Sequence, residues 1–157
     1  MMINNIVQKG RYFMVRPIGE FESLNEVTII NPKMCKQLSI QVEVEQRDEG
    51  HVPHVHVYLD KTRNKKNCAY IRLDVPEYCT HHKDGKHLSR KQKEEFIELM
   101  ESMIRGAAIY DNDGNMLQAN GYQNAVMIWS ETWENGSLEK FKLDENGIIV
   151  TPNYRVL

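Results

Sequence analysis

The chain has 157 residues, of which 41% are hydrophobic and 27% charged, and its formal net charge is −2. These values predict one soluble globular domain over residues 1–157 and exclude a disordered chain. No apolar run approaches the roughly 18 residues of a membrane span, no signal peptide is expected, and three cysteines without a Cys-x-x-Cys pair predict a cytoplasmic protein.

Strands dominate the first half of the predicted fold. Short strands are expected within residues 11–18 and 27–30. From residue 37 to residue 45 apolar and polar residues alternate strictly, which is typical of a half-buried strand. The same alternation returns over residues 54–59 and again over residues 69–75, where Pro76 ends it. Three strands on short connections predict an antiparallel meander.

Helices are expected in the second half. Ser89 and Gln92 have the spacing of a capping box, and apolar residues recur at helical spacing from Phe96 to Ala107, which predicts an amphipathic helix of about four turns. A turn or hairpin is expected at residues 111–114. A second helix is expected from Asn120, with Trp129 and Trp133 on its apolar stripe. Strands followed by helices predict an α+β fold, with two amphipathic helices packed on one face of the sheet.

The six histidines all lie between residues 51 and 87, and none lies elsewhere. They are His51, His54, His56, His81, His82 and His87. Histidine is the commonest metal ligand in proteins and the side chain that titrates nearest to neutral pH. This segment is therefore where we look for a functional site.

Strand alternation predicts a polar sheet face around these histidines. It carries His54, His56 and Tyr58 from one strand and Tyr70, Arg72 and Asp74 from the next. We expect a register that pairs Tyr58 with Tyr70, His56 with Arg72, and His54 with Asp74. The preceding strand would bring Gln41, Glu43 or Glu45 beside the same histidines.

One interpretation of this face is a divalent metal site for Zn, Fe or Mn. His54 and His56 would be ligands together with a carboxylate of Glu43 or Asp74, because two histidines and one carboxylate form a known metal-binding arrangement. His81 and His82, in the loop after the third strand, would add a ligand or an acid–base group. The chain would then be a metal-dependent hydrolase or nuclease.

The other interpretation is an open, solvated face that binds a partner, with no catalysis. Tyr58, Tyr70, Arg72, His81 and His82 are its candidate binding residues. A protein partner is expected. Nucleic acid is a weaker alternative, supported by basic residues in the loop that begins at Lys61 and at the helix start near Arg90. Pro53 suggests an edge strand, which would allow a homodimer to form by strand addition. Because no complete catalytic set is visible, this non-enzymatic interpretation is preferred.

The run Val52-Pro53-His54-Val55-His56-Val57-Tyr58 resembles the signature of a small bacterial domain family of unknown function, which has a Pro-His-aromatic-His strand. The resemblance covers residues 38–133 and leaves residues 1–37 and 134–157 as additional segments. It departs from the family where Val55 replaces the usual aromatic residue. Family members often occur in gene pairs that look like toxin–antitoxin modules. The resemblance therefore implies a regulatory module of a bacterial or phage system, and it matches only His54 and His56 residue by residue.

Overall fold

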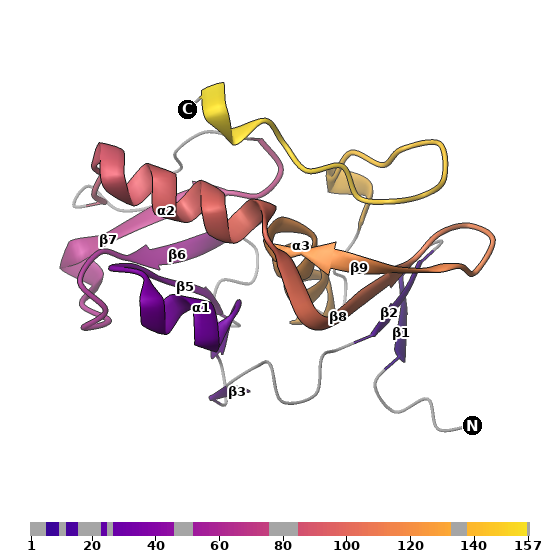
Figure 1. Ribbon diagram of the computed structural model, residues 1–157, viewed down its shortest axis with the longest axis horizontal. Coiled ribbons are helices and arrows are strands. Elements are labelled where there is room, and N and C mark those ends of the chain that lie inside the picture. Colours follow the sequence, from indigo (N-terminus) through magenta and orange to yellow (C-terminus); the bar gives the residue numbers. More distant parts are fainter. Residues whose placement is uncertain are drawn as a thin grey trace.

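The computed structural model describes the backbone of residues 6–9, 12–15, 23–24, 27–45, 52–75, 85–132 and 138–156. Over these residues the chain forms two antiparallel sheets and three α-helices (Figure 1). The predicted α+β class is confirmed. None of the described helices is both long and apolar enough to cross a membrane.

The first sheet contains the predicted meander. Its strands, in spatial order, are β3 (Ser23–Leu24), β4 (Val27–Ile29), β5 (Gln41–Glu45), β6 (His54–Tyr58) and β7 (Cys68–Arg72). The last three strands are neighbours both along the chain and in space, and all pair antiparallel. The strand that follows Pro53 lies between two others, so the free edge expected beside Pro53 is wrong.

The second sheet is built on a hairpin. Its strands, in spatial order, are β1 (Ile6–Lys9), β2 (Tyr12–Val15), β8 (Met103–Tyr110) and β9 (Met116–Asn120). The hairpin expected around residues 111–114 joins β8 to β9 and is confirmed. Asp111 Oδ1 accepts hydrogen bonds from the backbone N–H groups of Asp113 and Asn115, which fixes this turn.

Helix α2 (Arg90–Glu101) is shorter than predicted. The capping box between Ser89 and Gln92 is present, but the helix ends before Ser102, and the residues that follow form β8. Ile104 and Ala107 are buried at a spacing of three residues, which looks helical in the sequence. In the structure this spacing comes from an irregularity in the β8 register, where Gly106 adopts a φ of 82°.

Helix α1 (Pro32–Gln37) is absent from the prediction. Asn31 caps it by accepting a hydrogen bond from the Met34 N–H, and Pro32 occupies the first turn, where a missing N–H costs nothing. The strand expected over residues 37–45 therefore begins at Gln41.

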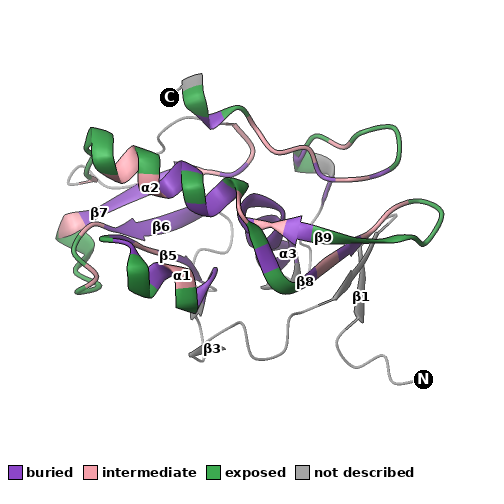
Figure 2. Cartoon of the chain, in the orientation of Figure 1, coloured by how far each residue is buried: buried purple, intermediate pink, exposed green. Residues whose placement is uncertain are grey.

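The core lies between the helices and the first sheet. Val42, Val55, Val57 and Ile71 are fully buried there together with Phe96 of α2. Helix α3 (Gly121–Thr132) is buried on every side from Gly121 to Ser130. All five residues of β6 are buried, so both faces of the sheet are covered at this strand (Figure 2).

Candidate functional site

The polar face of the first sheet has a register that differs from the prediction. His54 pairs with Arg72, His56 with Tyr70, and Tyr58 with Cys68. The predicted register is wrong by two residues. Since a shift of two preserves the alternation of faces, the predicted polar residues still share one face. On the other side of β6, Glu43 pairs with His56.

This face is buried and not solvated. His54 and His56 expose 1% and 2% of their surface, and Glu43 and Glu45 expose 0% and 1%. Tyr58 and Tyr70 are equally buried. The predicted open polar surface is therefore wrong. Burying this many polar groups is costly unless each finds a partner, so the contacts among them are informative.

The centre of the face is a pair of histidines. The Nε2 atoms of His54 and His56 lie 3.2 Å apart. The rings are nearly parallel, with an interplanar angle of 20° and centroids separated by 5.1 Å. The rings of Tyr70 and Trp129 lie against His54, at centroid distances of 5.9 and 5.5 Å. Trp129 reaches this site from α3, as its position on the predicted apolar stripe does not reveal.

Both histidines already use their other ring nitrogen. His54 Nδ1 lies 2.7 Å from the carbonyl oxygen of Val52, which only accepts hydrogen bonds, so this nitrogen carries a proton. His56 Nδ1 lies 2.6 Å from Glu45 Oε2 and donates to that carboxylate. Each Nε2 is then left with a lone pair. Two lone pairs at 3.2 Å repel each other, unless a proton or a metal cation lies between them.

Tyr58 completes the surroundings of the Glu45 carboxylate. Its hydroxyl donates a hydrogen bond to Glu45 Oε2 at 3.2 Å. Burial raises the pKa of Tyr58 well above its usual value, and the neighbouring Glu45 carboxylate acts in the same direction. The tyrosine therefore remains protonated and serves as a donor. Its donation stabilises Glu45 as an ion, which in turn favours a proton on His56 Nδ1.

The second carboxylate of β5 faces the loop between β6 and β7. Arg63 Nε lies 3.1 and 3.0 Å from the two carboxylate oxygens of Glu43, and Gln41 Nε2 also donates to Glu43. Lys65 Nζ lies 3.9 Å from Glu45 Oε1. The buried carboxylates therefore draw two cations of the basic loop onto the sheet.

Asp74 does not join the histidines. It accepts two hydrogen bonds from Arg72, from Nε at 2.9 Å and from Nη2 at 2.7 Å. Over the described residues, no group of three or more His, Cys, Asp or Glu side chains is arranged to hold a metal ion. The structure thus brings together His54 and His56 of the predicted metal set and separates Asp74 from them.

Glu45 is the residue that the predicted set lacks. It shares the alternating face with Glu43, but only its side-chain direction decides that it, and not Glu43, contacts His56. No sequence signal distinguishes the two carboxylates. The predicted residues His81 and His82 lie outside the residues that the structure describes, as do His51 and Trp133.

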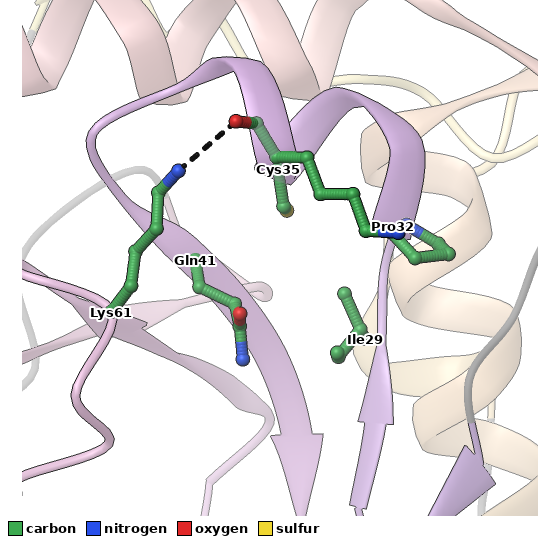
Figure 3. A pocket seen from close by; sticks show the side chains of 6 residues that line it. Ile29, Pro32, Cys35, Gln41 and Lys61 are labelled. Carbon is green, nitrogen blue, oxygen red and sulfur yellow. Dashed lines mark hydrogen bonds between the residues drawn. The ribbon is translucent and has the colours of Figure 1, made fainter.

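A separate pocket of about 180 Å³ lies between α1 and the β4–β5 pair (Figure 3). Ile29, Pro32 and Cys35 give it apolar walls, and Lys61 borders it, donating to the Lys36 carbonyl oxygen at 3.3 Å. Burial raises the pKa of the Cys35 thiol, which leaves it a poor nucleophile. Gln41 lines this pocket and also binds Glu43, but no ligand class is specified by the lining.

Comparisons of the chain with family models, with curated proteins and with solved structures find no match in any of the three. The resemblance to the bacterial Pro-His-aromatic-His family stays a prediction.

Proposed function

We propose that the chain is a metal-dependent hydrolase in which His54 and His56 bind one divalent cation, Zn, Fe or Mn. A single observation carries this proposal: two imidazole Nε2 atoms lie 3.2 Å apart while both Nδ1 atoms are engaged as donors. Metal-binding histidines typically donate their second nitrogen to a carboxylate or a backbone carbonyl, as these two do.

The spacing of the two nitrogens suits a shared cation. Two nitrogens that each bind one tetrahedral metal at about 2.0–2.1 Å lie about 3.3 Å apart. The observed 3.2 Å is close to this value. With two nitrogens as protein ligands, the other coordination positions go to water or substrate, and a divalent cation lowers the pKa of such a water into the range where hydroxide forms at neutral pH.

The residues around the pair have separate roles in this proposal. Val52 and Glu45 fix the rings and keep Nε2 as the free lone pair. The Glu45 carboxylate also offsets part of the charge of a bound cation, which matters because the site is buried. The burial of this face argues against the binding-module hypothesis, because that hypothesis uses the same residues as an open contact surface.

The test is metal binding by untagged protein, measured by elemental analysis after dialysis and by calorimetric titration with Zn²⁺ and Mn²⁺. Wild type is expected to bind one equivalent. The His54→Gln/His56→Gln variant, which preserves side-chain size, is expected to bind none. His87→Ala, which removes an exposed histidine, serves as the control. Equal binding by the double variant and wild type would refute the site.

A further inference from the structure

We infer that the substrate of this site is a phosphate ester, whose phosphate group is held by Arg63 and Lys65. This inference rests on the proposed metal site and names its substrate class. It starts from the position of the two cations, which extend from the exposed loop of residues 60–67 to the buried carboxylates of β5.

Arg63 is held in place but keeps one side toward solvent. Its Nε atom is engaged by Glu43, and its guanidinium carbon lies 5.8 Å from the centroid of the Tyr58 ring. Over the described residues neither Nη atom takes part in a hydrogen bond, and the side chain remains 40% exposed. A guanidinium fixed on one side and open on the other is suited to a bidentate oxyanion.

The backbone of the loop is shaped to deliver these side chains. Arg63 and Lys61 both adopt positive φ values, 57° and 65°, which cost non-glycine residues about 1–2 kcal/mol each. Asp60 stabilises this conformation: one carboxylate oxygen accepts from the N–H and hydroxyl of Thr62, and the other accepts from Asn67 Nδ2. Strain maintained by a dedicated network is typical of functional loops.

Charge balance links the anion to the metal. Glu43 and Glu45 contribute two negative charges, and Arg63 and Lys65 contribute two positive ones, so the cluster alone is close to neutral. A divalent cation on the histidine pair makes the cluster positive, and an anion of matching charge restores neutrality. We therefore expect metal and phosphate to bind with positive coupling.

A phosphate monoester fits this arrangement better than a carboxylate. Its three terminal oxygens suffice for the guanidinium, the ammonium and the metal together, whereas a carboxylate has two oxygens. In the hydrolysis, the water oxygen forms a new bond to phosphorus and the ester P–O bond breaks. One proton of the water goes to the departing alkoxide, and the products are an alcohol and inorganic phosphate.

The experiment measures binding of phenyl phosphate and of benzoate by calorimetry, to apo and to Mn²⁺-loaded protein. Metal loading is expected to tighten phenyl phosphate binding at least about tenfold and to leave benzoate behind. Arg63→Gln/Lys65→Gln should lose this gain and still bind the metal. Lys66→Gln/Lys91→Gln removes the same charge from two exposed lysines and should behave as wild type.

Since loss of Arg63 leaves Glu43 buried without its cation, Glu43→Gln/Arg63→Gln provides a second variant in which both charges are removed. It should fold and bind phenyl phosphate weakly. The inference is overturned if either Arg63 variant binds phenyl phosphate as tightly as wild type, or if benzoate binds equally well. If no metal binds, the proposed function fails separately. An Arg63-dependent affinity of the apo protein for phenyl phosphate would then support the anion site alone.

Discussion

His54 and His56 are two residues apart on one strand, and their Nε2 atoms approach to 3.2 Å although each Nδ1 already donates a hydrogen bond. The Val52 carbonyl and the Glu45 carboxylate fix the proton positions, and together they leave room for one cation between the rings. In the metal-free protein that cation is a proton shared by the pair. The proton and a metal ion therefore compete for the same two lone pairs.

The first prediction is that metal binding releases about one proton per cation, because the shared proton must leave before both Nε2 atoms bind the metal. Calorimetric titration with Zn²⁺ at pH 7, in two buffers of different ionisation enthalpy, measures this number directly. The His54→Gln/His56→Gln variant provides the blank. Heats that do not depend on the buffer would mean that no proton is displaced.

The second prediction separates the two buried carboxylates of β5. Glu45→Gln removes the charge that His56 Nδ1 contacts, and we expect the metal affinity to fall about 10- to 100-fold, as for other carboxylates that hydrogen-bond a metal-binding histidine. Glu43→Gln, two residues away on the same face, keeps that contact intact and should change the affinity much less. Calorimetry on both variants makes the comparison. Equal losses would assign the effect to charge in general and not to the contact with His56.

The sequence predicts the meander because the alternation in β5, β6 and β7 is unbroken, and each strand carries its apolar residues on one face. Its limits are equally physical. Ile104 and Ala107 have helical spacing, and only the irregular register around Gly106 shows that they belong to a strand. The strand pairing was predicted two residues out of register because alternation fixes the face of a residue but not its partner.

The candidate site shows the same limit. Alternation brings His54 and His56 together, since residues i and i+2 of a strand always share a face. Burial of that face depends on residues distant in sequence, such as Trp129 of α3, whose ring lies 5.5 Å from that of His54. The choice of Glu45 over Glu43 depends on side-chain rotamers. Neither property is written in a local pattern.

The third prediction concerns the contact between α3 and α2. A Cβ atom added at Gly121 would lie 2.0 Å from the carbonyl oxygen of Leu99, so the backbone must move to accommodate it. We expect Gly121→Ala to lower the free energy of unfolding by about 3 kcal/mol, at the upper end for overpacking.

Gly114→Ala is the control for this substitution. Its site is open, with no atom within 4 Å of the added Cβ, but its φ of 83° is strained for alanine. The expected loss is about 1–2 kcal/mol. Urea unfolding of both variants measures the difference, and a Gly121→Ala protein as stable as wild type would show that the helices separate easily.

The last prediction is a loss of stability at alkaline pH that depends on Cys68. Burial raises the pKa of this thiol from 9.0 to about 12, and the carboxylates of Glu45 and Glu43 add to the effect. Between these pH values the folded protein retains a proton that the unfolded chain releases. Its contribution is therefore complete below pH 9 and declines as the pH rises toward 12, by about 1.4 kcal/mol per pH unit at most. Cys68→Ala should flatten the fall in the free energy of unfolding between pH 9 and pH 10, measured by urea titration. The pKa of Tyr58 is raised from a higher starting value, so its own contribution declines only above pH 10. A variant that loses stability as steeply as wild type over that interval would show that Cys68 ionises in the folded protein without penalty.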